Sequence, residues 1–183
     1  MKNILVIGAA GQIGSELVPA LRKLGFMTVA GFSRTPLTPE LAAGGPSERI
    51  DILDGTGLVD VIRRHRIDTV FNLAAMLSAK AEAQPLSAWN VGVNGLLNVL
   101  EAARIEHCAV FTPSSIGVFG DSTPHAKTPQ DTVCRPKTVY GITKVTGELL
   151  SDYYFLKYGV DTRSVRYPGL ISSVTPPGGG TTD

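Results

Sequence analysis

The chain alternates short apolar segments with longer amphipathic ones, and this alternation constrains the fold more than any other feature of the sequence. Several apolar segments are apolar at both alternate sets of positions, which a parallel sheet covered by helices on both faces requires. We therefore predict an α/β fold with a doubly wound parallel sheet, in one domain over 1–183. Strands are expected at 3–9, 27–33, 49–53, 68–74, 108–114 and 160–167, and helices at 12–24, 38–44, 55–66, 86–105 and 137–158.

The composition argues against several classes of partner. The net charge is +1, and the basic run at 63–66 is best explained as the solvated end of a helix, so we expect no nucleic-acid partner. No apolar run reaches the roughly 18 residues of a membrane-spanning helix, and the apolar start lacks the features of a signal peptide. Cys108 and Cys134 suit unpaired thiols in a cytoplasmic protein, and three scattered histidines predict no metal site.

A glycine pattern marks the first junction between a strand and a helix. The segment "VIGAAGQIGSEL" places Gly8, Gly11 and Gly14 directly after the first strand and at the start of the helix. In a dinucleotide site the first glycine permits a tight turn, the second lets the backbone approach the pyrophosphate, and the third allows close helix packing. The helix N-terminus, here at Gln12 and Ile13, adds N–H groups and positive potential. The sequence thus predicts a Rossmann domain that binds NAD(P).

The end of the second strand usually distinguishes NAD from NADP. An acidic residue there binds the ribose hydroxyls in NAD enzymes, whereas this chain has Ser33 and Arg34. A guanidinium suits a 2′-phosphate, so these residues favour NADP; alternatively, Arg34 lies over the adenine or faces solvent. Further cofactor contacts are expected where the third and fourth strands end, from Asp51, Ile52, Leu73, Ala74 and Ala75.

Tyr140 and Lys144 in "TVYGITK" are one helical turn apart, so their side chains share a helix face. Chance supplies such pairs often, but here the preceding strand ends in two serines, Ser114 and Ser115. A lysine ammonium favours the phenolate form of a neighbouring tyrosine, which then acts as a base, and a serine hydroxyl holds the substrate alcohol. We therefore predict that Tyr140 and Lys144 are catalytic; the alternative for the serines is a turn or a helix cap.

Together these motifs resemble the extended short-chain dehydrogenases/reductases, the NAD-dependent epimerase/dehydratase superfamily, over the whole nucleotide-binding half of that family. "NLAA", "NGLLNVLEAA" and "TPSSIGVFG" carry the resemblance, and "RPKTVYGITKVTGELL" and "RYPGLISSVTPPGGGTTD" make the chain most similar to the short-chain L-threonine 3-dehydrogenases. The resemblance implies oxidation of L-threonine to 2-amino-3-ketobutyrate with NAD as the cofactor. It also implies a homodimer that packs the helices at 86–105 and 137–158 across a two-fold axis.

The same resemblance assigns roles to individual residues. Ser115 would hold the substrate alcohol, with Ser114 as the alternative, and Lys144 would also bind the nicotinamide ribose. Ser78 would contact the substrate carboxylate, unless it only caps the next turn. The remaining contacts implied are Thr181 with the far end of the substrate, and Tyr167 and Pro168 with the nicotinamide carboxamide.

Three features depart from the family pattern. The acidic NAD residue is missing, Gly92 stands where the family usually has asparagine, and the chain ends within a substrate-loop segment at about 170–183. We therefore expect the C-terminal substrate-binding region of the family to be missing. Two other functions stay open, an NDP-sugar epimerase or dehydratase and a non-catalytic dinucleotide-binding fragment.

Overall fold

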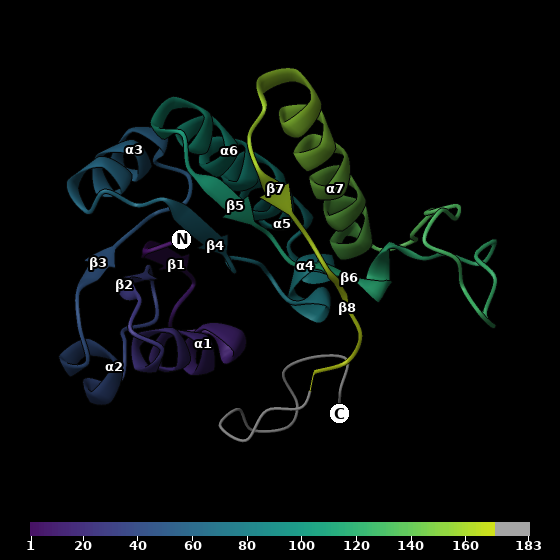
Figure 1. Ribbon diagram of the computed structural model, residues 1–183. Coiled ribbons are helices and arrows are strands. Elements are labelled where there is room, and N and C mark those ends of the chain that lie inside the picture. The colour runs from purple at the N-terminus through teal and green to yellow at the C-terminus, as the bar shows by residue number, and fades with distance from the viewer. Residues whose placement is uncertain (171–183) are drawn as a thin grey trace.

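Six parallel strands form the central sheet of the protein, which is described here for residues 1–170 from a computed structural model (Figure 1). The strand order is β3-β2-β1-β4-β5-β7, in which the first two crossovers move outward from β1 to β2 and β3, and the third returns to β4 on the other side of β1. This order confirms the predicted doubly wound sheet. The strands are β1 (Asn3–Ile7), β2 (Met27–Phe32), β3 (Ser47–Arg49), β4 (Thr69–Asn72), β5 (Ala109–Phe111) and β7 (Thr162–Arg163).

Helices cover both faces of this sheet (Figure 1). One face carries α1 (Gln12–Lys23) and α2 (Pro39–Ala43), and the other carries α3 (Gly55–Arg64), α6 (Gly95–Glu106) and α7 (Val139–Tyr158). Successive strand residues point to opposite faces of the sheet. Because helices cover both faces, β1 is buried on both sides. Its residues Ile4 and Val6 pack with α1 and α2, whereas Leu5 and Ile7 belong to the larger core beneath α3 and α6.

Two expected strands are each divided between two sheets. The segment 108–114 contains β5 and then β6 (Ser114–Ser115), and the segment 160–167 contains β7 and then β8 (Arg166–Tyr167). β6 and β8 pair with each other in a separate parallel sheet. Pro113 separates β5 from β6, and because proline has no backbone N–H it cannot continue the ladder of the main sheet.

The expected strand at 49–53 was placed too late in the chain. β3 ends at Arg49, and Asp51 then forms a turn in which its Oδ1 accepts a hydrogen bond from the Leu53 N–H. Asp54 caps α3 by accepting from the Gly57 N–H. Asp51 and Ile52 therefore follow the strand instead of ending it.

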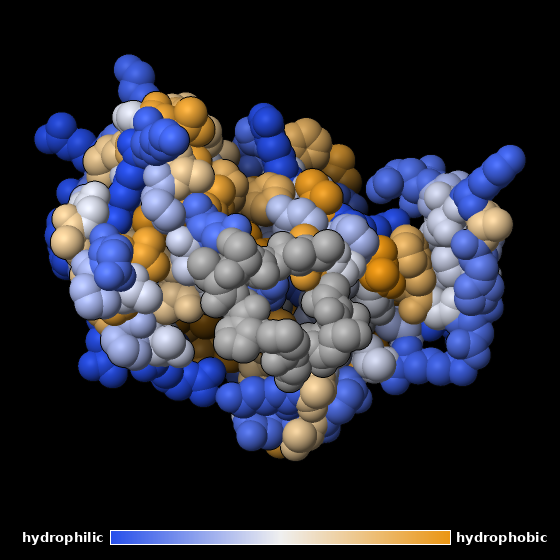
Figure 2. All heavy atoms as spheres, turned by 90° about the horizontal axis from the view of Figure 1, so that it is seen from below, coloured by the Kyte–Doolittle hydropathy of each residue, from blue (hydrophilic) through white to orange (hydrophobic). Residues whose placement is uncertain are grey.

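The long helix expected at 86–105 is a series of three segments. It begins as α5 (Pro85–Trp89), continues as the π-helical segment η1 (Asn90–Asn94), which contains Gly92, and becomes α6. A further helix, α4 (Ser78–Ala83), was not predicted, because six residues are too few to show a helical period. The segment 120–137, which leads into α7, projects from the body of the domain, and its surface is mostly hydrophilic (Figures 1 and 2).

Candidate functional site

The glycine loop presents a backbone surface, at Gly8, Gly11 and Gly14, beside the carboxyl ends of β1 and β4. Gly8 has φ +85°, and a Cβ added there would lie 3.0 Å from the Leu73 carbonyl carbon and 3.2 Å from the Ala74 nitrogen. A Cβ added at Gly14 would lie only 2.3 Å from the Gly8 oxygen. The first helix thus begins in close backbone contact with the loop, and only glycine fits at either position.

This surface fits the pyrophosphate of a dinucleotide. Gly11 precedes α1 without a side-chain cap, and the first turn of α1, including Gln12 and Ile13, contains no acidic residue. The first N–H groups of a helix have no partner within the helix, so they are available to an anion. NAD(P) is therefore compatible with the residues present, and the glycine cradle is the observation that supports it.

The expected adenosine contacts lie at the ends of β2 and β3. Ser33 and Arg34 directly follow β2 and are exposed, and Asp51 is exposed after β3. Ile52 differs from the expectation, because its side chain is 6% exposed and packs where a Cβ on Gly95 would lie, 2.9 Å away. Ile52 therefore belongs to the core, and its carbonyl oxygen accepts a hydrogen bond from Asn98 Nδ2.

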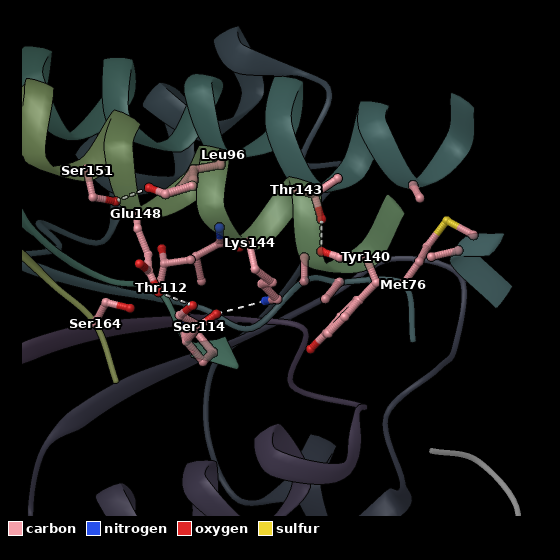
Figure 3. Close-up of a pocket in the computed structure, with 18 residues that line it drawn as sticks. Met76, Leu96, Thr112, Ser114, Tyr140, Thr143, Lys144, Glu148, Ser151 and Ser164 are labelled. Carbon is pink, nitrogen blue, oxygen red and sulfur yellow. Dashed lines mark hydrogen bonds between the residues drawn. The ribbon is translucent and has the colours of Figure 1, made fainter. Parts of the chain in front are cut away.

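A small pocket lies between the carboxyl ends of β4 and β5 and the helices α4 to α7 (Figure 3). Tyr140 and Lys144 line it, and both side chains reach from α7 to the same side of the helix (Figure 3). Lys144 Nζ donates a 2.8 Å hydrogen bond to the Pro113 carbonyl oxygen and lies 5.5 Å from the centroid of the Tyr140 ring. Burial of the ammonium lowers the pKa of Lys144 to about 8.

The two serines at the end of the strand have different environments. Ser114 is buried, and its Oγ donates a 2.5 Å hydrogen bond to Glu148 Oε1. Ser115 Oγ accepts from the Gly117 N–H at 3.1 Å and caps the 3₁₀ helix η2 (Ile116–Val118). A Cβ added at Gly117 would lie 3.4 Å from Ser115 Oγ and 3.3 Å from two carbons of the Tyr140 ring. Ser115 Oγ and the Tyr140 ring thus lie on either side of Gly117, whereas Ser114 lines the pocket together with Tyr140 and Lys144.

A second tyrosine–lysine pair with the same spacing shows that spacing alone does not define a site. Tyr153 and Lys157 also lie one turn apart on α7, and Lys157 Nζ donates to the Tyr153 hydroxyl at 2.6 Å. This hydrogen bond lowers the pKa of Tyr153. Both residues are exposed and neither lines the pocket, so the tertiary structure, and not the sequence motif, distinguishes Tyr140 and Lys144.

Two polar residues in the pocket were not predicted individually. Asn72 ends β4 and is 3% exposed, and Thr112 follows β5. Asn72 Oδ1 and Thr112 Oγ1 are buried and have no hydrogen-bond partner within residues 1–170. The signal available in the sequence was the position of both residues at the carboxyl ends of adjacent parallel strands, where ligands bind in this class of sheet.

The remaining predicted residues lie around this region. Ala74 and Ala75 line the pocket, as does Gly92, whose added Cβ would lie 3.0 Å from the Thr143 Cβ. Ser78 is the first residue of α4, where Leu77 occupies the cap position, so Ser78 does not cap that helix. Tyr167 pairs with Ser115 across the small sheet, Pro168 follows it and is exposed, and Thr181 lies outside the described residues.

Within residues 1–170 the helices are too short or too polar to span a membrane. The histidine, cysteine, aspartate and glutamate side chains of the same range form no group of three or more that could hold a metal ion.

Comparison with known proteins gives consistent matches. The sequence profile of the NAD dependent epimerase/dehydratase family matches residues 4–181. A protein of Staphylococcus aureus strain MRSA252, described as an uncharacterized epimerase/dehydratase, is 50% identical over 185 residues, which is 100% of this chain and 58% of that protein. The solved L-threonine dehydrogenase of Clostridium difficile is 52% identical with a TM-score of 0.95, and the L-threonine 3-dehydrogenase of Trypanosoma brucei is 40% identical with a TM-score of 0.92. The chain is covered completely in both comparisons but spans 58% of each of those two chains.

Proposed function

The chain belongs to the NAD dependent epimerase/dehydratase family, and from that premise we propose that it is an NAD(P)-dependent oxidoreductase that oxidises a secondary alcohol. The proposed substrate is L-threonine and the product is 2-amino-3-ketobutyrate. The observation that most supports a catalytic site is the meeting of Tyr140, Lys144 and the strand end carrying Ser115 near the glycine loop. The substrate assignment is supported by 52% identity to the L-threonine dehydrogenase of Clostridium difficile.

Each of the three residues has a distinct role in the proposed reaction. Tyr140 removes the proton of the substrate hydroxyl as a general base, and the Lys144 Nζ, 5.5 Å from its ring centroid, places a positive charge beside the reacting group. Ser115 Oγ already accepts a hydrogen bond from Gly117, so its own proton is available to the substrate oxygen. The oxidised nicotinamide, when bound, supplies the acceptor for the substrate hydride.

The proposed cofactor site extends from the glycine loop to the ends of β2 and β3. Arg34 is exposed beyond β2 and makes no ion pair within residues 1–170 at the distances that define one. A free guanidinium in this place favours a 2′-phosphate and therefore NADP, whereas the resemblance to threonine dehydrogenases favours NAD. Leu73, Ala74 and Ala75 supply close backbone, and Tyr167 and Pro168 are proposed to lie at the nicotinamide end.

A second copy of the chain is the proposed protein partner. Ile142, Leu149 and Leu156 recur every seven residues on α7, so they lie on one side of the helix, and they are 42%, 64% and 81% exposed. Leu86 and Trp89 on the adjacent α5 are also exposed. An apolar row of this length on two neighbouring helices supports helix-to-helix pairing across a two-fold axis.

Substitution of each tyrosine in the two matched pairs tests the proposed mechanism. The assay mixes the protein with L-threonine and NAD or NADP and follows absorbance of the reduced nicotinamide. We expect Tyr140→Phe to lower kcat at least about a hundredfold with little change in cofactor affinity, because only the general base is lost. Tyr153→Phe, which alters the other pair on the same helix, should retain activity. Equal activity of the two variants contradicts the assignment of Tyr140.

One observation favours a second function. The S. aureus protein that is 50% identical to this chain is described as an uncharacterized epimerase/dehydratase, and a solved UDP-glucose 4-epimerase of Thermotoga maritima is 27% identical with a TM-score of 0.84, which together support the alternative of an NDP-sugar epimerase or dehydratase. The same tyrosine and lysine serve that chemistry, because an epimerase also oxidises a secondary alcohol. Conversion of a UDP-hexose without net change in nicotinamide absorbance, together with no reaction of threonine, would favour this alternative.

A further inference from the structure

We infer that Glu148 is a positioning residue, which fixes the strand pair carrying Ser115 to the helix carrying Tyr140 and Lys144. The catalytic roles of Ser115, Tyr140 and Lys144 in this inference rest on the proposed function. The mechanical coupling between the helix and the strand pair can be tested without it.

One carboxylate connects both strands of the small sheet to α7. Glu148 lies one turn after Lys144, so Tyr140, Lys144 and Glu148 follow one another along the same side of the helix. Glu148 Oε1 accepts from Ser114 Oγ at 2.5 Å and from Arg166 Nε at 2.9 Å, and Glu148 Oε2 accepts from Arg166 Nη2 at 2.7 Å. Ser114 and Arg166 are directly paired between β6 and β8. The bidentate arginine–carboxylate pair restricts the direction as well as the distance of this connection.

The small sheet needs such a connection because it has little backbone pairing of its own. β6 and β8 contain two residues each and belong to no larger sheet among the described residues. Two-stranded pairs of this size are marginal in water without side-chain support. The backbone contributes the Ser114 N–H bond to the Val165 carbonyl oxygen at 2.9 Å.

Helix α7 holds two consecutive residues that immediately precede Ser115. Lys144 Nζ donates to the Pro113 carbonyl at 2.8 Å, and Glu148 accepts from the Ser114 hydroxyl. Loss of the second hydrogen bond releases the residue adjacent to Ser115 while the first stays in place. Because catalysis depends on placement within about 1 Å, a small displacement of Ser115 is sufficient to lower the rate.

Glu148 and its partner Arg166 are only partly accessible to water. The side chains of Glu148 and Arg166 are 19% and 21% exposed. Burial raises the pKa of Glu148, but the hydrogen bonds from Arg166 and Ser114 outweigh it, so the pKa lies below its usual value. The carboxylate is therefore charged at neutral pH. Glu148→Gln keeps the shape of the side chain but replaces one acceptor oxygen with an NH₂ group that cannot accept from Arg166.

Amide hydrogen exchange of the full chain tests the coupling directly. In Glu148→Gln we expect exchange in residues 112–119 and 164–168 to accelerate about tenfold or more, with the amides of β1 and β4 unchanged. Glu101→Gln is the matched control, since Glu101 also accepts from an arginine and a hydroxyl, namely Arg104 and Tyr154, but on α6. It should leave both segments unchanged. Unchanged exchange in Glu148→Gln, or an equal acceleration throughout the sheet, would overturn the inference.

Two further measurements keep the coupling separate from simple destabilisation. Ser114→Ala retains the Glu148–Arg166 pair, so it should accelerate exchange in 112–119 while 164–168 changes little; no change in 112–119 contradicts the inference. In the threonine assay Glu148→Gln should lower kcat at least about tenfold with KM nearly unchanged, and Glu101→Gln should leave both values as they are. If the unmodified chain oxidises no threonine, the proposed function fails, and the exchange pattern still decides whether Glu148 positions the strand pair.

Discussion

Gly141 lies beside Tyr140 in a place where the structure leaves no room for a side chain. A Cβ added there would lie 2.2 Å from the Gly117 carbonyl oxygen and 2.5 Å from the Pro136 Cβ. These distances are about 1 Å shorter than ordinary van der Waals contacts, and the Gly117 oxygen is backbone that cannot rotate away. In Gly141→Ala, therefore, α7 must move away from η2, which separates Tyr140 from Ser115.

The expected cost follows from two opposing effects. Alanine is favoured over glycine within a helix by up to about 1 kcal/mol, whereas overpacking a rigid contact costs about 1–3 kcal/mol or more. We expect a net loss of about 1–2 kcal/mol, which lowers the Tm by roughly 2–8 °C for a chain of this size. A displacement of about 1 Å at the catalytic pair should also reduce kcat about a hundredfold.

Gly147→Ala provides a control on the same helix. A Cβ at Gly147 would meet only the Leu96 Cδ2 atom, at 3.1 Å, which is the end of a flexible side chain. The gain in helix propensity should therefore leave stability unchanged or slightly increased. Thermal unfolding followed by circular dichroism compares the two variants, and the threonine assay reports the activity. If Gly141→Ala is as stable and as active as Gly147→Ala, the close approach of α7 to η2 does not position Tyr140.

Three other predictions concern the buried lysine, the cofactor and the partner. Lys144→Met should raise the free energy of unfolding at pH 7 by on the order of 1–2 kcal/mol, because the folded-state pKa of Lys144, about 8, lies below the ordinary value of 10.5. Between these two pH values the unfolded chain binds more protons than the folded one, so the wild-type protein gains stability as the pH rises. The difference in stability between variant and wild type, measured by chemical denaturation, should therefore shrink over the same range. A difference in stability between variant and wild type that is no larger at pH 7 than at pH 10 contradicts this reasoning. Arg34→Ala should weaken NADP binding about tenfold in a fluorescence titration while NAD binding changes little, and unchanged NADP affinity would refute the role of Arg34. Joint replacement of Leu149 and Leu156 by serine should convert the dimer to a monomer, as measured by light scattering. Leu24→Ser, which changes a leucine that is 73% exposed at the end of α1, should leave the dimer intact. A dimer that persists after the joint replacement excludes this face of α7 as the interface.

Much of the fold could be predicted because local patterns specified it. The period of the apolar residues located the main strands and long helices, and the glycine positions located the loop that begins α1. The errors occur where single residues or short segments change the course of the chain and leave the apolar period unchanged. Pro113 ends β5 and moves Ser114 into a second sheet, and Asp51 turns the chain after β3.

The sequence by itself determined the doubly wound sheet, the glycine loop and the Tyr-x-x-x-Lys motif, because these depend on periodicity and on residues adjacent along the chain. The tertiary structure placed Tyr140 and Lys144 in the pocket and left Tyr153 and Lys157, which share the same spacing on the same helix, outside it. Only the tertiary structure, too, gave the two adjacent serines different partners, since Ser114 donates to Glu148 and Ser115 accepts from the Gly117 N–H. The physical reason is that spacing decides which side chains share a face of a helix, whereas packing against the rest of the molecule decides what that face meets.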